Sequence, residues 1–247
     1  MGCFDVIRIL TEKNLDKEFL NKYKHLLKVG VRGFGYWIWK PYIIKKTLQE
    51  MNDGDQLLYL DAGCHLNNGG KKRLFEYFDA VDSSDLKVGA FQIESCHNEK
   101  RWTKMDLVAE LGVSKNDEIL ESGQICATHV ILQKSCTSVD FVNEWMRIVE
   151  NIHYIDDSPS ALPNFPDFVE HRHDQSVFSI LCKLRAAVVF NGFEVYPSDD
   201  VSWSKMNIYP IHDKRDKKFS FFCTMSDKIY RYVKKLKCKL FKIFENK

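Results

Sequence analysis

The sequence predicts one α/β domain with a mainly parallel central sheet flanked by helices, followed by a basic amphipathic C-terminal helix. Strand-like and helix-like segments alternate along residues 1–213. One of them, 56–60 (QLLYL), is apolar enough to be a strand covered on both faces. Residues 214–247 contain 12 Lys and Arg against 3 Asp and Glu, whereas residues 1–213 carry a net charge of −7. We therefore expect an α/β domain at 1–213 and a separate basic tail at 214–247.

The composition is that of a folded protein with free thiols. A chain of 247 residues with 45% hydrophobic residues can bury one large core. Its eight cysteines are scattered, without a CxxC motif or paired zinc-ligand spacing. With no signal-peptide pattern or membrane-length apolar run, we expect a reducing cytoplasm, and disulfides are the less favoured alternative. The cysteines are Cys3, Cys64, Cys96, Cys126, Cys136, Cys182, Cys223 and Cys238.

The first part of the chain predicts a strand, two helices and a second strand. Residues 4–10 (FDVIRIL) end in apolar β-formers and predict a strand near the N-terminus. A helix over about 15–27 has apolar residues at helical spacing. Pro41 suits the first residue of the next helix, because its missing N–H costs nothing there. A turn at 52–55 (NDGD) then leads into strand 56–60.

The rest of the domain continues the alternation. After a break at 67–70 (NNGG), we expect a helix with Leu74, Phe75 and Phe78 on one side, a strand near 87–93, a helix near 104–111, a strand at 125–132 and a helix at 139–149. Residues 152–168 then become irregular, which is typical of a binding loop or lid, or of a plain surface excursion. A last helix is expected at 177–184.

Charged residues gather at two places where an element ends or begins. Asp61 follows strand 56–60, at the edge where open α/β sheets bind their ligands. A turn or a helix cap would also explain a lone Asp there. The run 171–176 (HRHDQS) precedes the helix at 177–184. Either Asp174 only caps that helix and the histidines are solvated, or this cluster faces the same opening as Asp61.

The segment 32–41 (RGFGYWIWKP) combines glycines with aromatic residues. Glycines such as Gly35 allow a close approach of the backbone to a ligand. Aromatic rings at Tyr36, Trp37 and Trp39 offer a stacking face for a base or sugar, although core packing would explain one or two of them.

Together these motifs resemble a family of bacterial glycosyltransferases associated with O-antigen and capsule gene clusters. The resemblance covers about residues 4–212 and rests on four segments: RGFGYWIWKP at 32–41, YLDAGC at 59–64, Gln124 in ESGQICA, and HRHDQS at 171–176. It implies a GT-A-like fold with a Rossmann-type nucleotide-binding half and a nucleotide-diphospho-sugar donor. It also implies a hexosyltransferase-type reaction onto a glycan or lipid-linked glycan acceptor in surface polysaccharide synthesis.

The reaction suggests roles for the residues in these motifs. Asp174 is the candidate catalytic residue, as a general base if the reaction inverts the anomeric centre or as a stabiliser of the sugar cation if it retains it. Arg32 and Lys40 are the candidates for the departing pyrophosphate. The candidate substrate-binding residues are Arg32, Gly35, Tyr36, Trp37, Trp39, Lys40, Asp61, Ala62, Gly63, Gln124, His171, Arg172, His173 and Gln175.

A divalent metal, Mn²⁺ or Mg²⁺, is the cofactor that the resemblance implies. Enzymes of this fold usually carry an Asp-x-Asp motif, but Gly63 stands in the third position here. Asp61 would then hold the ion as a single carboxylate, helped by donor phosphate oxygens and waters. His65 and His212 are conceivable further ligands, against the alternative that each is simply packed or solvated.

The basic tail has its own prediction. Residues 224–244 place apolar and basic side chains at helical spacing. Such helices lie on anionic membrane surfaces, which would place the protein at the inner face of the plasma membrane as a peripheral protein. The alternative is a terminal helix packed on the domain with a solvated basic face. Nucleic-acid binding is not expected, because no reading motif accompanies the charge.

Two other functions remain open. A sugar nucleotidyltransferase would share the nucleotide-binding logic, but its glycine-rich phosphate loop followed by a lysine is not seen near the N-terminus. A non-catalytic nucleotide- or sugar-binding module would be compatible with Gly63 in place of a second aspartate.

Overall fold

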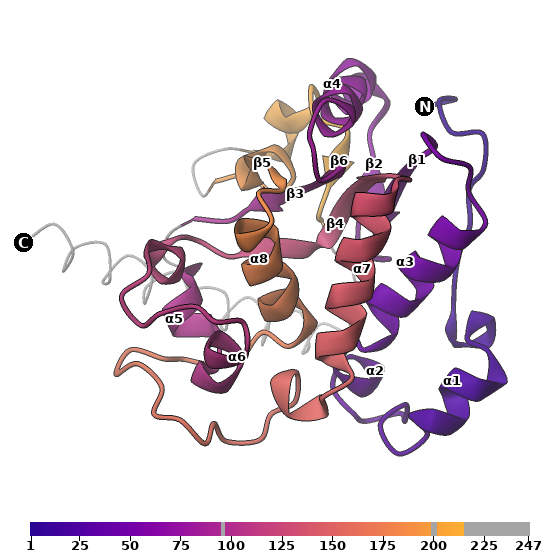
Figure 1. Ribbon diagram of the computed structural model, residues 1–247. Helices are drawn as coiled ribbons and strands as arrows, with labels where there is room; N and C mark the ends of the chain where they lie inside the picture. The colour runs from indigo at the N-terminus through magenta and orange to yellow at the C-terminus, as the bar shows by residue number, and fades with distance from the viewer. Residues whose placement is uncertain (95–96, 199–201, 215–247) are drawn as a thin grey trace, which may run out of the picture.

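The computed structural model describes residues 1–94, 97–198 and 202–214, and Figure 1 shows how their helices and strands are arranged. The predicted tail helix at 224–244, and with it the predicted membrane contact, lies outside the described residues.

The described residues form the alternating elements that the sequence predicts from residue 39 onward. The strands are β1 (Gln56–Leu60), β2 (His65–Leu66), β3 (Val88–Gln92), β4 (Ile125–Gln133), β5 (Val188–Asn191) and β6 (Ile211–His212). The α-helices are α1 (Lys17–Lys22), α3 (Trp39–Gln49), α4 (Lys71–Asp82), α5 (Glu99–Trp102), α6 (Met105–Glu110), α7 (Cys136–Val149) and α8 (Asp174–Leu184), and the segment labelled α2 (Gly33–Tyr36) is a left-handed turn. No helix among them has the length and apolarity to cross a lipid bilayer.

The central sheet is mixed, which corrects the expectation of a mainly parallel one. Its strand order is β1-β4-β3-β5, and only the β3–β5 pairing is parallel among its described strands. β4 runs against its neighbours because the chain between β3 and β4 stays at one edge of the sheet. There the Ile93 N–H donates to the Gln124 carbonyl, so β4 begins where β3 ends. A second, two-stranded sheet pairs β2 with β6.

Helices cover both faces of the four-stranded sheet. α3, α7 and α8 lie over one face (Figure 1), where Val130 and Leu132 of β4 join the larger core. α4 covers the other face and packs on Ile131 of the same strand. This alternation along β4 follows from the two-residue period of a strand, and it buries the sheet between two helical layers.

The prediction of a first strand at residues 4–10 is wrong. The segment has no strand partner, and Val6, Ile7 and Ile9 are 70%, 76% and 88% exposed. A β-forming composition becomes a strand only where a neighbouring strand offers a ladder of hydrogen bonds, and the described sheet offers none here. The segment instead runs past α3, where Arg8 pairs with Glu50 at 2.5 Å.

Two helices differ from their predicted extent. The helix predicted over about 15–27 is α1, which ends at Lys22 and continues as hydrogen-bonded turns. In α4 the buried stripe is Leu74, Tyr77, Phe78 and Val81, a spacing of three and four residues. Phe75 lies one position off that stripe and is 45% exposed, so it does not share the buried side as predicted.

Candidate functional site

Asp61 stands at the end of β1, at the edge of the sheet. Its N–H donates to the Thr128 carbonyl of β4 at 3.0 Å, which continues the ladder by one residue. The chain then turns, because the Cys64 N–H donates back to the Asp61 carbonyl at 3.0 Å. The phenol of Tyr59 donates to Oδ1 of Asp61 at 2.7 Å. The strand end and this hydrogen bond together fix the carboxylate in one orientation.

Lys40 of α3 joins this carboxylate to Asp174 at the start of α8. Its Nζ lies 3.3 Å from Asp61 Oδ1 and 3.2 Å from Asp174 Oδ2, and it donates to the Ala127 carbonyl at 3.2 Å. Two ion pairs and one hydrogen bond therefore surround the ammonium group. The side chains of Lys40 and Asp174 are only 3% and 4% exposed, whereas that of Asp61 is 27% exposed. Asp61 is thus the member of this cluster that an incoming ligand can reach.

The electrostatics of the cluster bring the pKa of one carboxyl group close to neutral pH. Burial, only partly offset by Lys40 and reinforced by the negative charge of Asp61, raises the pKa of Asp174 to about 6. Burial alone would lower the pKa of Lys40, but the two carboxylates outweigh it and raise that pKa, so Lys40 is charged. Burial also raises the pKa of Tyr59, which keeps its phenol protonated as a donor. With both acids ionised, the cluster carries one net negative charge.

The residues before Lys40 form a left-handed turn. Every residue from Gly33 to Trp37 has a positive φ, including the non-glycine residues Phe34 (51°), Tyr36 (55°) and Trp37 (60°). The indole N–H of Trp39 donates to the Gly33 carbonyl at 3.0 Å and holds the turn closed. Each non-glycine residue in this conformation costs roughly 1–2 kcal/mol. Strain of this kind is concentrated at ligand sites.

His173 packs directly on this turn. Its ring lies 5.4 Å, between centroids, from the rings of both Tyr36 and Trp37. Its own φ is 57°, another strained value. Nδ1–H donates to the Ile155 carbonyl at 2.6 Å, and Nε2 has no hydrogen-bond partner within the described chain. Burial lowers the pKa of His173, so Nε2 is a buried lone pair.

The first prediction tests whether the turn needs its glycines. A Cβ on Gly33 would overlap the indole ring of Trp37 and would force an L-residue to keep a φ of +59°. We expect Gly33→Ala to lower the free energy of unfolding by roughly 2–5 kcal/mol, from overpacking and backbone strain together. Gly30→Ala is the matched control, because Gly30 also has a positive φ but nothing within 4 Å. Urea unfolding of both variants separates the two costs, and equal losses would show that the indole contact contributes nothing.

Arg32 lies beside the turn on the solvent side. Its guanidinium is 3.5 Å from Asp157 and 3.6 Å from Glu170, and its side chain is 40% exposed. Arg172 also pairs with Glu170, at 3.3 Å, and stacks on the indole of Trp102 at 4.2 Å. Long, exposed ion pairs such as those of Arg32 are weak and can be exchanged for another anion.

The irregular segment 152–168 is held in place by two residues of the adjoining chain. Lys104, beside α6, donates to Asp156 at 3.0 Å and to the Ser158 carbonyl at 3.0 Å. Asp106 accepts from the His153 ring at 2.5 Å and from the backbone N–H groups of residues 161 and 162. These contacts fix the position of segment 152–168, and with it the point at which the 171–176 run begins.

The side chains of His171 and Gln124 are hydrogen-bonded to neighbouring parts of the protein. His171 accepts from the Lys104 N–H at Nδ1 and donates from Nε2 to the Tyr154 carbonyl at 2.8 Å, and burial lowers its pKa to about 3. Gln124 is buried and donates to Glu99 at 3.1 Å, while the side chain of Gln175 donates to Gln124 Oε1 at 2.8 Å. Gln124 therefore holds the start of α8, and His171 holds the chain that leads into it.

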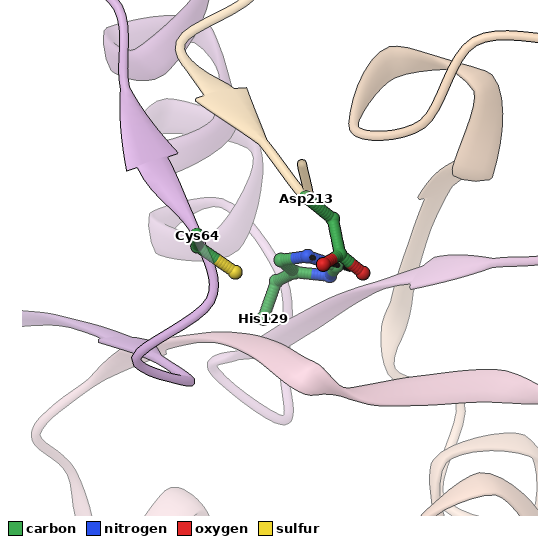
Figure 2. Close-up of side chains that lie close together, drawn as sticks. All are labelled: Cys64, His129 and Asp213. Carbon is green, nitrogen blue, oxygen red and sulfur yellow. Dashed lines mark ion pairs between the residues drawn. The ribbon is translucent and has the colours of Figure 1, made fainter. Parts of the chain in front are cut away.

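The predicted metal ligands Asp61, His65 and His212 do not form a ligand group in the described part of the chain. His65 and His212 are opposite each other in the β2–β6 ladder, His65 exposed and His212 buried with its Nε2–H donating to a backbone carbonyl. Neighbouring residues of an extended chain point to opposite faces. Cys64 and Asp213, next to the two histidines, accordingly turn to the other side and meet His129 of β4 (Figure 2).

A hard divalent ion fits neither the site at Asp61 nor the group of Cys64, His129 and Asp213 well. At Asp61, the second carboxylate that could share an ion is Asp174, and both are already compensated by the ammonium group of Lys40. The other group offers a thiol, an imidazole and a carboxylate, which is softer than the oxygen ligands that Mg²⁺ and Mn²⁺ prefer. We therefore assign no step of a reaction to Mg²⁺ or Mn²⁺.

Neither a protein-family model nor a curated protein sequence matches this chain. Among solved structures, the chain is similar to the crystal structure of mouse xyloside xylosyltransferase 1 in its apo form, with a TM-score of 0.40 and 13% sequence identity. The likeness covers 71% of this chain and 58% of that one, so the chain spans less than two thirds of the length of that protein. At this TM-score the likeness carries no weight for fold or activity.

The structure thus brings some of the sequence candidates together and leaves others apart. Lys40, Asp61 and Asp174 form one cluster, and Tyr36, Trp37 and His173 form a second. The indole N–H of Trp39 is hydrogen-bonded to the Gly33 carbonyl, while Ala62 and Gly63 form the turn after Asp61. Sequence reasoning missed Tyr59, although an aromatic two residues before an acid on a strand shares its face. It also missed Glu99, because a Glu among charged residues looks solvated and this one is fully buried.

Proposed function

We propose that the chain is a glycosyltransferase that uses a nucleotide-diphospho-sugar. The observation that carries the proposal is the cluster of Lys40, Asp61 and Asp174, one residue from each of three separated motifs, at one edge of the sheet. Core packing alone gives no reason to bury a lysine between two carboxylates, because the desolvation of such a group is costly. Burial of this kind is typical of ligand and catalytic sites.

The cluster would act on the sugar side of the donor. Asp61 is partly exposed, and its Oδ1 is already occupied by Tyr59 and Lys40. Within the described chain Oδ2 has no hydrogen-bond partner, so it is the oxygen that accepts from hydroxyl groups of the ligand. Lys40 takes a positioning role, in place of the phosphate contact expected from the sequence, because its ammonium group is buried against two carboxylates and a backbone carbonyl.

The phosphate side is assigned to Arg32. Its weak pairs with Asp157 and Glu170 can be exchanged for the oxygens of a departing pyrophosphate, which a guanidinium binds in bidentate fashion. The rings of Tyr36 and Trp37 supply a stacking surface beside it, and the lone pair of His173 Nε2 can accept from a hydroxyl group. Positive charge on one side and carboxylates on the other is what this transfer needs.

Asp174 is the proposed catalytic carboxylate. With a pKa of about 6 it is ionised above neutral pH and can take a proton from an acceptor hydroxyl, or it can stabilise a sugar cation. Because its side chain is only 4% exposed, a substrate would reach it only after the neighbouring chain moves. The acceptor is proposed to be a glycan or lipid-linked glycan, with the basic tail at 214–247 holding the enzyme at an anionic membrane.

A panel of nucleotide sugars tests this function. We expect one class of nucleotide sugar to raise the melting temperature of the full chain and to be turned over, with release of the nucleoside diphosphate. Asp61→Asn should weaken donor binding by roughly tenfold to a hundredfold, the value of a hydrogen bond to a charged group. His65→Ala is the control, because His65 is an exposed residue shortly after Asp61. This variant should bind the donor as the wild type does.

The same panel separates the alternatives. Binding without turnover, with every acceptor tried, would identify a non-catalytic sugar- or nucleotide-binding module. Formation of pyrophosphate from a sugar phosphate and a nucleoside triphosphate would identify a nucleotidyltransferase. If no nucleotide sugar shifts the melting temperature and Asp61→Asn behaves as the wild type, the proposed function is wrong.

A further inference from the structure

Cys64, His129 and Asp213 bring three kinds of metal ligand to one place. Figure 2 shows the sulfur of Cys64, the ring of His129 and the carboxylate of Asp213 directed toward one another. Their ligand atoms all lie within 4.8 Å of one another, and His129 Nε2 is 3.9 Å from Asp213 Oδ2. The residues are far apart in the sequence, so the fold itself creates this convergence.

We propose that these three residues bind one transition-metal ion of the zinc type. Around a tetrahedral Zn²⁺ with bonds of about 2.0–2.3 Å, ligand atoms are roughly 3.3–3.6 Å apart. Each separation therefore has to shorten by at most about 1.5 Å, which small side-chain rotations achieve. Three protein ligands leave the fourth position for water or for a further ligand.

The ligand types select the metal. A thiolate and an imidazole favour zinc and similar ions over Mg²⁺ or Ca²⁺, which prefer oxygen. A thiolate and a carboxylate together also balance the two charges of the ion, so the complex is neutral. Neutrality matters here because His129 is 1% exposed and its ring packs against the edge of Phe91, at 5.7 Å between centroids. Binding would release the proton of the Cys64 thiol.

The ion would connect the two sheets. Cys64 directly precedes β2, Asp213 directly follows β6, and His129 lies on β4 of the central sheet. The backbone N–H of Cys64 also donates to the Asp61 carbonyl, so the same ion would hold the turn that carries Asp61. The test of this role does not use activity, so its result does not depend on the proposed sugar transfer.

Metal binding by the full chain tests the proposal. Apo protein is prepared under reducing conditions with a chelator and titrated with Zn²⁺, and Co²⁺ is used as a spectroscopic substitute. We expect one equivalent of bound Zn²⁺ and a thiolate-to-cobalt charge-transfer band. Cys64→Ser should abolish that band. Asp213→Asn should keep the band but weaken Zn²⁺ binding by roughly a hundredfold or more, because even outer-shell changes cost 10–100-fold.

Two control variants make the result specific. His65→Ala changes the outward-facing neighbour of Cys64, and Cys136→Ser removes an exposed cysteine on α7, so both should bind Zn²⁺ as the wild type does. Circular dichroism of the apo variants checks their folding, and Asp213→Asn alone decides the matter if Cys64→Ser does not fold. The proposal is overturned if the wild type binds no stoichiometric Zn²⁺, or if Cys64→Ser keeps the band or Asp213→Asn keeps full affinity.

Discussion

Asp174→Asn should lower turnover by roughly a hundredfold or more while leaving the protein at least as stable as the wild type at pH 8. The loss of turnover follows from removing the carboxylate proposed to take the acceptor proton or to stabilise the sugar cation. The stability follows from burial, which raises the pKa of Asp174 from 3.8 to about 6 against the opposing effect of Lys40. A raised pKa gives stability that is complete below pH 3.8 and is lost as the pH rises through about 6.

At pH 8 Asp174 is ionised, so the wild type has lost this contribution to its stability. The Asn of the variant stays neutral, so the variant keeps it. Asn also keeps the acceptor oxygen for the Gln175 N–H at the start of α8. Turnover is measured with the donor found above, and urea unfolding at about pH 5 and 8 gives the stability. Asp16→Asn, at an exposed carboxylate before α1, is the control for turnover. Normal turnover with a lowered melting temperature would instead show that Asp174 is only a helix cap.

Lys40→Met should produce the largest loss of stability. Removing one partner of a buried ion pair costs about 3–5 kcal/mol, because the remaining charge is left uncompensated. Here the remaining group is Asp174, close to a second carboxylate, Asp61. Without Lys40 the pKa of Asp174 must rise above 6, so its stability contribution is lost over a higher pH range. The destabilisation should therefore be small at about pH 5 and large at about pH 8.

A double variant and a surface variant give this prediction its controls. Lys40→Met with Asp174→Asn should recover most of the loss at pH 8, because it removes the charge that Lys40 compensates. Lys46→Met breaks an exposed pair with Asp16 of 2.8 Å, which should matter by less than about 1 kcal/mol. Equal unfolding midpoints for Lys40→Met and the wild type at pH 8 would remove the ammonium from the centre of the cluster.

The strands β1, β3 and β4 and the helices α4, α6, α7 and α8 could be predicted because their hydrophobic periods are strong, whereas the short elements β2 and α5 were missed. The direction of β4 could not, since it depends on how the chain between β3 and β4 returns, and no local pattern encodes that path. The first strand failed for a related reason: residues 4–10 have the composition of a strand but lack a partner in the described sheet. Composition gives a segment a preference for the extended conformation, but a strand forms only where a neighbouring strand can pair with it.

The candidate site was predictable in part. From their strand-end and helix-start positions, one of the two alternatives left open by the sequence had Asp61 and Asp174 facing the same opening, and the structure brings both to Lys40. It assigned Lys40 to phosphate, because a sequence does not reveal that one ammonium group will meet two carboxylates. The proposed metal ligands Cys64 and Asp213 each lie one residue away from His65 and His212, at the end of the β2–β6 ladder where the two histidines face each other. A shift of one residue along a strand moves a side chain to the opposite face.

The left-handed turn has a consequence for which part of the domain opens first. Its three non-glycine residues together store roughly 3–6 kcal/mol, a large share of the roughly 5–15 kcal/mol that stabilises a whole domain. That energy is released as soon as the segment leaves its packing, so local opening here needs less free energy than opening of the β4 core. The rings of Tyr36 and Trp37 would separate from His173 in that opened state. A ligand stacked on those rings would bind only the closed state and would slow the exchange of the backbone amides around it.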